Sequence, residues 1–244
     1  PDHVHPALGT SHANFLAYLA FARGGRIAAE TPAYEALHRL GAAVGATVQP
    51  FRRCVENGWR VDPEGLAAAT RDGVDLIAIT DLHNPSGTRL DPADLDLLIE
   101  TAEHCDAVLL VDEVYLDLDP LDRPSAATRH ERVVITNSLT KSHGLWDLRI
   151  GWVLGAPDRM RQIAAWDDLV CPSLPLLTAS QALRYLPQAR EHLLANRARA
   201  AALTDRVDAW VTSRDDVWWT KPDAAFTGFV RLGTAERPLD GDVI

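Results

Sequence analysis

Apolar runs separated by amphipathic segments constrain the fold of this sequence more than any other feature. Runs of strand length, nearly free of polar side chains, occur at residues 74–80, 107–112, 133–137 and 150–154. A segment with helical spacing, residues 91–104, lies between the first two runs and begins with Asp-Pro, a typical helix start. Strands that are apolar throughout are buried on both faces. The pattern therefore predicts an α/β fold in which helices cover both faces of a mainly parallel sheet.

The character of the sequence changes in its C-terminal quarter. Residues 189–211 are rich in Ala and Arg with helical spacing, and short strands are predicted at residues 217–220 and 228–232. We therefore predict a large domain over residues 1–186 and a partial small α+β domain over residues 187–244. A sheet of so few strands would have an open edge, so we expect the small domain to be incomplete.

Composition excludes several classes of protein. The 244 residues include 34 acidic and 24 basic side chains, a net charge of −10, which argues against binding to nucleic acid or to an anionic membrane. No apolar run approaches the roughly 20 residues of a transmembrane helix. The cysteines are three, an odd number without close spacing, and indicate reduced thiols in a cytoplasmic protein. No metal is expected, because His3, His5 and His12 have no second ligand pair at zinc spacing.

Polar side chains follow three of the predicted strands at the point where each strand ends. Asn84 follows the first run, Asp112 and Tyr115 follow the second, and Ser138 and Lys141 follow the third. In a parallel sheet the ligand site lies beyond the carboxyl ends of the strands, so these side chains are candidates for one site. Lysine is rare in this chain, which has two among its 24 basic residues.

Five short motifs together resemble one enzyme family. Residues 138–151, with Ser-x-x-Lys followed eight residues later by Arg and then by Ile-Gly, resemble the Schiff-base lysine motif of fold-type I pyridoxal-phosphate enzymes, the aspartate aminotransferase superfamily of classes I and II. Residues 32–34 (Pro-Ala-Tyr), 83–87 (His-Asn-Pro-Ser-Gly) and 111–115 (Val-Asp-Glu-Val-Tyr) match further motifs in the expected order, and residues 9–13 look like the phosphate-binding turn. The resemblance covers about residues 4–235 and implies a sheet of the seven-stranded type and the cofactor pyridoxal 5′-phosphate.

The resemblance implies a catalytic role for three residues. Lys141 would form the Schiff base with the cofactor and move protons at the substrate Cα. Asp112 would pair with the pyridine nitrogen, and Tyr115 and Asn84 would donate hydrogen bonds to the phenolic oxygen of the cofactor. From the residues alone, Asp112 could instead cap a turn, Asn84 could be a turn residue before Pro85, and Lys141 could be a surface lysine.

The remaining implied contacts hold the rest of the cofactor. Thr10 and Ser11, at a predicted helix N-terminus, Ser138 with its hydroxyl and Arg149 with its guanidinium would bind the phosphate. Tyr34 would stack on the pyridine ring. The alternatives are a core aromatic for Tyr34 and an ordinary surface arginine for Arg149.

The resemblance implies an aminotransferase that moves an amino group between an amino acid and a 2-oxo acid, and a homodimer with residues 168–177 in the interface. The family's substrate-binding arginine has no counterpart here, because neither Arg231 nor Arg237 lies in a matching motif, and the family's N-terminal segment is missing. Two alternatives remain open: a carbon–sulfur lyase of the same fold, and a non-catalytic domain that binds or senses pyridoxal phosphate.

Overall fold

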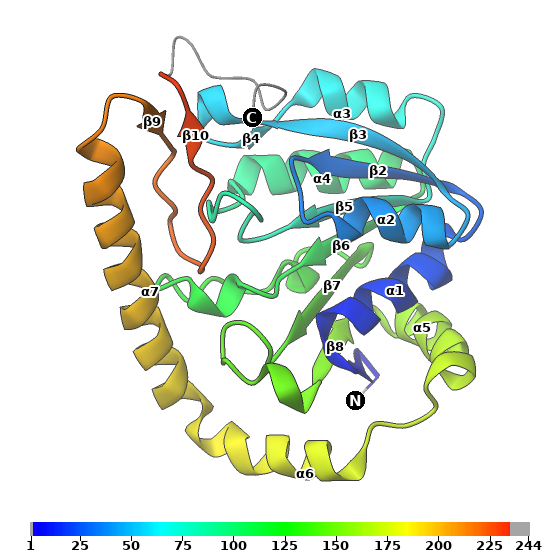
Figure 1. The fold of residues 1–244 in the computed structure, drawn as a ribbon. Coiled ribbons are helices and arrows are strands. Elements are labelled where there is room, and N and C mark those ends of the chain that lie inside the picture. The colour runs from blue at the N-terminus through cyan, green and yellow to red at the C-terminus, as the bar shows by residue number, and fades with distance from the viewer. Residues whose placement is uncertain (1, 235–244) are drawn as a thin grey trace.

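The computed structural model describes residues 2–234 and contains one large sheet (Figure 1). The strand order is β1-β8-β7-β6-β5-β2-β3-β4. The strands are β1 (Val4–Ala7), β2 (Arg26–Thr31), β3 (Thr47–Cys54), β4 (Arg60–Val61), β5 (Leu76–Thr80), β6 (Val108–Asp112), β7 (Val133–Ser138) and β8 (Gly151–Leu154).

The predicted parallel sheet is confirmed. Five neighbouring strands, from β7 through β6, β5 and β2 to β3, run parallel, whereas β8, β1 and β4 pair antiparallel. The sheet exceeds the seven-stranded type only by the two-residue β4. Strand β1 was not predicted, because Pro6 interrupts a four-residue segment; proline is tolerated there since β1 is an edge strand.

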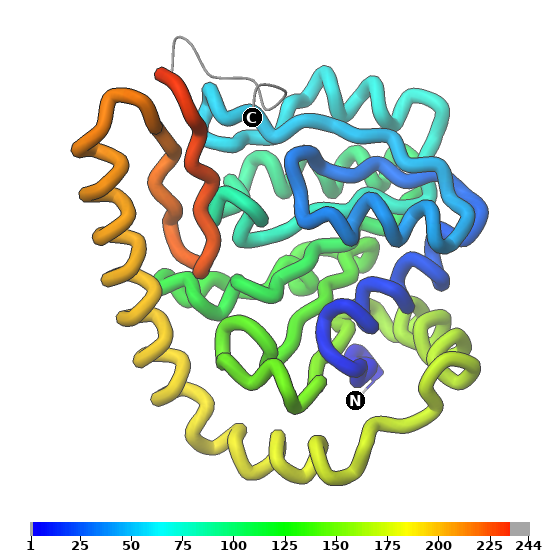
Figure 2. Tube along the Cα trace, in the orientation of Figure 1, coloured from blue at the N-terminus to red at the C-terminus, as the bar shows by residue number. Residues whose placement is uncertain are grey.

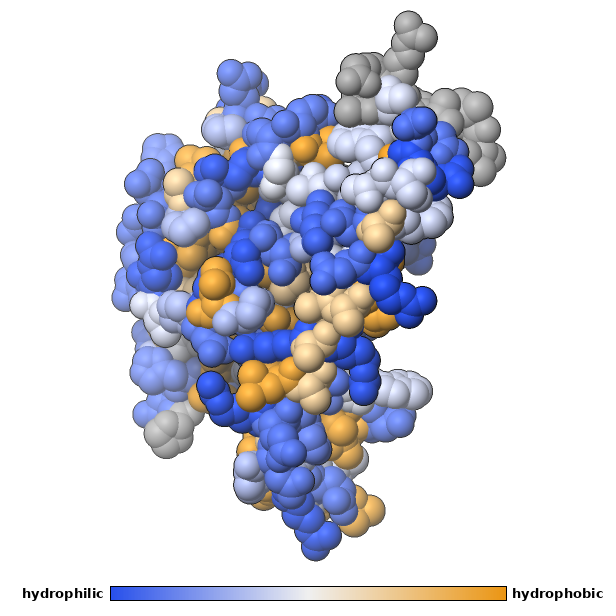
Figure 3. Space-filling model, turned by 90° about the vertical axis from the view of Figure 1, so that its left-hand side faces the viewer, coloured by the Kyte–Doolittle hydropathy of each residue, from blue (hydrophilic) through white to orange (hydrophobic). Residues whose placement is uncertain are grey.

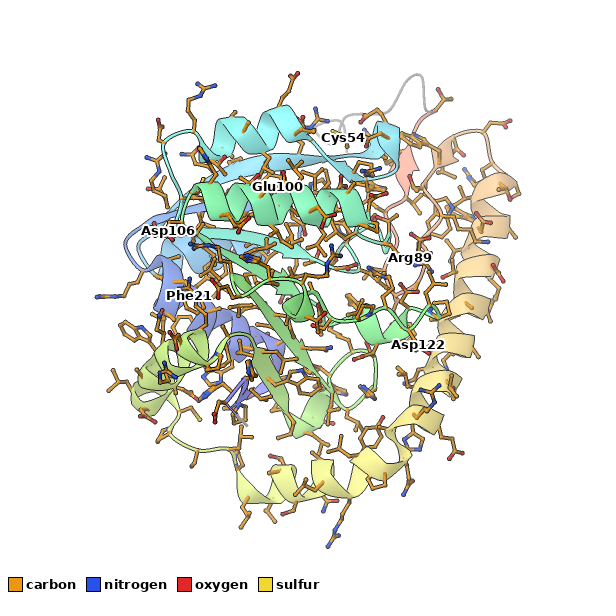
Figure 4. All side chains as sticks on the ribbon, turned by 180° about the vertical axis from the view of Figure 1, so that it is seen from behind. Phe21, Cys54, Arg89, Glu100, Asp106 and Asp122 are labelled. Atoms are coloured by element: carbon orange, nitrogen blue, oxygen red, sulfur yellow. The ribbon has the colours of Figure 1, made fainter. Side chains whose placement is uncertain are left out.

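Helices cover both faces of the sheet. One face packs against α1 (Gly9–Ala22), α2 (Ala36–Ala43) and α5 (Pro157–Val170), and the other against α3 (Pro63–Thr70) and α4 (Pro92–His104); Figure 4 shows α4, with Glu100, lying over this second face. Along β5, Leu76 and Ala78 join the first hydrophobic core, and Ile77 and Ile79 join the second. The alternation explains why the strands are apolar throughout.

Helix starts show where local sequence decides the structure. Asp62 and Asp91 accept hydrogen bonds at the starts of α3 and α4, each followed by proline, as predicted for α4. Thr10 and Ser11 lie in the first turn of the first helix, α1, which begins at Gly9, after Leu8, without a side-chain cap. The first-turn amides of α1 therefore have no capping side chain.

The C-terminal part leaves the sheet and runs along its side, as the trace in Figure 2 shows. It comprises α6 (Leu176–Tyr185), α7 (Ala189–Thr212) and a second sheet of β9 (Val217–Trp218) and β10 (Arg231–Leu232). Short 3₁₀ helices span Val55–Asn57, Leu116–Leu118, Ala126–Thr128, Trp146–Leu148 and Leu186–Gln188. Within residues 2–234, no helix is both long enough and apolar enough to cross a membrane.

Candidate active site

A cavity of about 240 Å³ lies at the carboxyl ends of β5 and β6. All the predicted cofactor-binding residues except Ser138 line it. Its lining residues are Thr10, Ser11, Asn14, Tyr34, Thr80, Asn84, Asp112, Val114, Tyr115, Thr140, Lys141, Trp146 and Arg149. Residues from six separate parts of the chain therefore meet where parallel sheets place their ligands.

Asp112 is a buried carboxylate at the wall of the cavity. Its Oδ2 accepts a hydrogen bond from Asn14 Nδ2 (2.8 Å), and its Oδ1 accepts one from the Val114 N–H (3.0 Å). Burial raises the pKa of Asp112 to about 6, against the opposing effect of these bonds and of the Lys141 charge. Among the described residues Asp112 has no ion-pair partner, so this end of the cavity favours a cation.

The two lysines have contrasting environments. Lys141 lines the cavity and forms no ion pair with any residue in the range 2–234. Lys221 lies on the surface, 2.9 Å from Asp205 Oδ1 and 3.0 Å from Asp208 Oδ2, and these carboxylates raise its pKa. Lys141 is therefore the lysine whose amine is available for chemistry, and Lys221 provides a matched control.

Another part of the cavity lining, formed by the start of α1 and by Arg149, is suited to an anion. The start of α1 presents backbone amides, and Arg149 Nη2 donates to the Leu8 carbonyl (3.0 Å) beside them. Gly9 has a φ of +79°, and a Cβ there would lie 2.5 Å from Arg149 Nη2. Only glycine therefore allows the guanidinium to approach this turn. Within the described chain the Arg149 guanidinium donates to backbone carbonyls and pairs with no carboxylate.

Ser138 lies behind the cavity wall. Its hydroxyl accepts a hydrogen bond from Thr10 Oγ1 (2.8 Å) and shares a hydrogen bond with the Thr140 hydroxyl. Ser138 is fully buried. The geometry supports an indirect role through Thr10, and direct contact of Ser138 with a phosphate stays a prediction.

Tyr34, Tyr115 and Asn84 also line the cavity. Tyr34 is 44% exposed, so the alternative of a core aromatic is wrong for this residue. Tyr115 is buried, and burial followed by the Asp112 charge raises its pKa, which keeps its hydroxyl a hydrogen-bond donor. The Asn84 N–H donates to Thr80 Oγ1 (2.9 Å).

Sequence reasoning missed several lining residues, of which Asn14 is the most informative. It is buried, donates to Asp112, and accepts from Thr136 Oγ1 (2.6 Å). Its only signal was a polar side chain in an apolar helix, one turn after Thr10. The other missed residues are Thr80, Val114, Thr140 and Trp146.

Other candidate residues lie away from the cavity lining. His143 Nδ1 is 2.8 Å from the Tyr185 hydroxyl, so it connects the lysine loop with α6. His5 and His12 both contact Asp167, at 2.7 and 3.3 Å. In the part of the chain that the structure describes, no group of three or more His, Cys, Asp or Glu side chains could hold a metal ion. The absence of a metal stays a prediction.

Of the two arginines considered for the substrate carboxylate, Arg231 is not among the residues that line the cavity. Arg231 lies over the Trp218 ring, with its guanidinium carbon 5.0 Å from the ring centroid. Arg237 lies outside the described residues.

Known proteins resemble this chain in sequence. Capreomycidine synthase of Streptomyces vinaceus is 32% identical over 182 residues, which are 71% of this chain and 46% of that protein. An arginine–pyruvate transaminase of Pseudomonas aeruginosa is 34% identical over 139 residues, 54% of this chain and 35% of that protein. The chain thus spans half or less of the length of these two relatives.

The fold resembles solved structures over almost the whole chain. A PLP-dependent aminotransferase from Streptococcus suis superposes with a TM-score of 0.88 at 27% identity, covering 95% of this chain and 62% of that one. The profile of the family described as aminotransferase class I and II matches residues 2–237. This match spans both the cavity and the C-terminal helices, and the chain therefore belongs to the class I and II aminotransferase family.

Proposed function

We propose that this chain is part of a pyridoxal-phosphate-dependent aminotransferase, which moves an amino group between an amino acid and a 2-oxo acid. One observation carries the proposal: Lys141, which has no ion-pair partner among residues 2–234, and the buried carboxylate of Asp112 line the same cavity as the start of α1 and Arg149. Because the chain is shorter than its relatives, the activity is proposed for the full-length protein.

The residues that line the cavity fit two parts of pyridoxal 5′-phosphate, its ring nitrogen and its phosphate. Asp112 is buried without an ion-pair partner among residues 2–234, and a protonated ring nitrogen would supply the missing cation. The amides of Thr10 and Ser11 and the Arg149 guanidinium form a site for a dianionic phosphate. When bound, the cofactor supplies an aldehyde that reacts with amines and a ring that accepts electron density from the substrate Cα.

The chain's own residues then have distinct tasks. Lys141 Nζ would hold the cofactor covalently and would serve as the base that moves the proton at the substrate Cα. The Asp112 carboxylate keeps a proton at the ring nitrogen, and Asn14 orients that carboxylate. Tyr115 and Asn84 would donate hydrogen bonds to the phenolic oxygen, and the Tyr34 ring would stack on the pyridine.

The test is chemical labelling of the two lysines. The cofactor-loaded full-length protein is reduced with borohydride, digested and mapped by mass spectrometry. We expect the cofactor label on the peptide that contains Lys141. A label on Lys221, which is held by Asp205 and Asp208, or on no lysine, would contradict the proposal.

A lyase reaction is the second candidate, because the relatives include a synthase and a threonine-phosphate decarboxylase alongside transaminases. All these reactions could use the same cofactor-binding residues. Product analysis separates them: transamination requires an added 2-oxo acid, whereas elimination from a cysteine conjugate yields pyruvate without one. A protein that binds the cofactor but turns over neither substrate would instead be a non-catalytic binding domain.

A homodimer is also part of the proposal. The predicted interface, residues 168–177, contains side chains with unusually large exposure for their type: Leu169 is 78% exposed, Leu176 82% and Leu177 80%. A second copy of the chain would bury them. A monomer in light scattering at micromolar concentration would count against the dimer.

Two further predictions remain proposals. The division into a large domain over residues 1–186 and a small domain over residues 187–244 is supported by the separate sheet of β9 and β10. A cytoplasmic location rests on the reduced state expected of the three cysteines.

A further inference from the structure

A buried ion pair beneath the cavity has no task in the reaction proposed above. Glu30 is in β2 and Arg53 in the neighbouring parallel strand β3, and both side chains are buried. Arg53 Nη1 donates to Glu30 Oε2 at 2.9 Å, and Arg53 Nε donates to the Trp59 carbonyl at 2.6 Å. A buried ion pair is seldom more stable than an apolar pair of similar volume, so its presence invites a functional explanation.

The second oxygen of Glu30 faces the cavity wall. Glu30 Oε1 accepts hydrogen bonds from the Thr80 backbone N–H (2.7 Å) and from Thr80 Oγ1 (2.6 Å). Thr80 ends β5 and lines the cavity. The same Oγ1 accepts from the Asn84 N–H at 2.9 Å. Four residues from separate strands and a loop are thus connected by consecutive hydrogen bonds.

The direction of these bonds follows from the charge of Glu30. An ionised carboxylate can only accept, so the Thr80 hydroxyl donates its proton to Glu30 and keeps its lone pairs for Asn84. Burial raises the pKa of Glu30 to about 7, and the Arg53 charge and the Thr80 bonds oppose this shift. Arg53 therefore favours the ionised form of Glu30, which is the form that accepts the hydrogen bond from the Thr80 hydroxyl.

The Asn84 loop depends on this contact. The N–H of Asn84 has Thr80 Oγ1 as its acceptor, and the next residue, Pro85, has no N–H. Hydrogen bonds of His83 to Thr88, Gly87 and Pro32 hold the residues around Asn84. Loss of the Thr80 hydroxyl would leave the Asn84 N–H itself without its acceptor. The side chain of Asn84 would then lose its fixed position at the cavity.

We propose that Glu30, Arg53 and Thr80 are positioning residues that anchor the Asn84 backbone and so direct the Asn84 amide to the phenolic oxygen of the cofactor. The inference rests on the proposed function, because that function defines the target of Asn84. Three residues outside the family motifs would thereby influence the proton affinity of the bound cofactor through Asn84.

The test compares Thr80→Val with Thr80→Ser. Valine has nearly the shape of threonine and retains the backbone bond to Glu30, but it lacks the hydroxyl; serine restores it. Thr70→Val is the matched control, because the hydroxyl of buried Thr70 donates to the Leu66 carbonyl in α3, outside the cavity lining.

The first measurement is amide hydrogen exchange of residues 81–87 in the cofactor-free full-length protein. Exchange should be faster in Thr80→Val than in wild type and unchanged in Thr80→Ser and Thr70→Val. Equal exchange rates in Thr80→Val and wild type would overturn the proposal, and this result would not depend on whether the protein binds the cofactor.

The second measurement is the pH midpoint of the visible absorption band of the lysine-bound cofactor. A hydrogen bond from Asn84 stabilises negative charge on the phenolic oxygen, so its loss should raise the midpoint by about 0.5 to 1 pH unit in Thr80→Val. Thr80→Ser should restore the wild-type midpoint. Glu30→Gln should shift it in the same direction, and the double variant with Thr80→Val should shift it no further.

The outcomes separate the two proposals. If the pH midpoint of the band is the same in Thr80→Val as in wild type, or shifts as far in Thr80→Ser as in Thr80→Val, the positioning role alone is overturned. Absence of any lysine-linked band in the wild type overturns the proposed function and, with it, the role of Asn84. Because Thr80→Val leaves the Glu30–Arg53 pair intact, its result stands even if Glu30→Gln fails to fold.

Discussion

The central sheet and the C-terminal arm, α6 with α7, bury their apolar side chains to very different extents. Every residue of β5 and β6 is buried, whereas α7 buries only Ala200 and Val211 along its 24 residues. Figure 3 shows the side of the molecule formed by the arm, where hydrophobic residues are exposed between hydrophilic ones. Exposed apolar side chains of α7 include Leu194, Leu203 and Val207.

Polar contacts join the arm to the segments that follow β6 and β7. Arg197 Nε donates to the Asp117 carbonyl (2.8 Å), and its Nη2 lies 2.6 Å from Asp122 Oδ1; Figure 4 shows Asp122 beside α7. Asn196 Nδ2 donates to the Ser142 carbonyl (3.0 Å), one residue from Lys141. The difference in burial shows that the residues lining the cavity belong to the region whose hydrophobic core is fully buried. The arm, by contrast, has apolar surface that only a further chain segment or a partner could cover.

Lys141→Ala tests the sheet side of this comparison with the largest expected effect. Turnover of the full-length protein should fall by several powers of ten, since attachment of the cofactor and proton transfer at Cα are both lost. Steady-state kinetics measures it. Lys221→Ala, in the C-terminal part, should retain turnover within a small factor, and a similar loss there would contradict the assignment.

Leu98→Ala and Leu177→Ala compare the two regions directly. Leu98 of α4 is fully buried, so its truncation should lower the free energy of unfolding by about 2–5 kcal/mol. Leu177 is 80% exposed, so its truncation in the monomer should change that free energy by about 0.5 kcal/mol or less. Urea denaturation at several protein concentrations is the measurement. A loss for Leu177→Ala that grows with concentration would show that a partner copy buries it, and equal losses at low concentration would refute the contrast.

Arg149→Ala tests the anion end of the cavity. Loss of a charge-assisted contact should weaken cofactor binding by about 1.5–3 kcal/mol, or about ten- to 150-fold in the dissociation constant. Equilibrium dialysis measures the change. Arg161→Ala is the control, because Arg161 pairs with Asp158 on the surface of α5. Unchanged affinity in Arg149→Ala would remove Arg149 from the phosphate site.

Asp112→Asn tests whether the buried carboxylate destabilises the cofactor-free protein. Burial raises its pKa to about 6, above the value of about 4 in an unfolded chain. The folded state therefore binds more protons between these values, and wild type loses stability as pH rises through this window, by about 3 kcal/mol. The variant avoids this loss but leaves one donor, Asn14 or Val114, unpaired at about 1 kcal/mol.

We therefore expect Asp112→Asn to be about 2 kcal/mol more stable than wild type at pH 8 and no more stable at pH 4, while binding cofactor more weakly. Urea denaturation at both pH values checks this. Asp96→Asn, which removes an exposed carboxylate beside Arg129, should show no such dependence on pH. A stability difference independent of pH would contradict the raised pKa of Asp112.

Elements with strong local signals could be predicted from the sequence. The helix over residues 92–104 has the predicted limits, because Asp91 caps it, Pro92 starts it and its periodicity runs without interruption. The central strands were found because burial on both faces makes them apolar throughout. Strand β1 had no comparable signal: it is four residues long, contains Pro6, and becomes a strand only by pairing with β8.

The sequence by itself determined the central parallel strands with the helix between β5 and β6, and most of the motif residues that line the cavity, because periodicity, capping and short motifs act within a few residues. The tertiary structure alone decided which other side chains join them. Asn14 and Asp112 are 98 positions apart, Thr10 and Ser138 are 128 apart, and Glu30 and Arg53 are 23 apart. Such pairs meet only when the strands take their places side by side, and a buried polar group shows its purpose only once its hydrogen-bond partner is known.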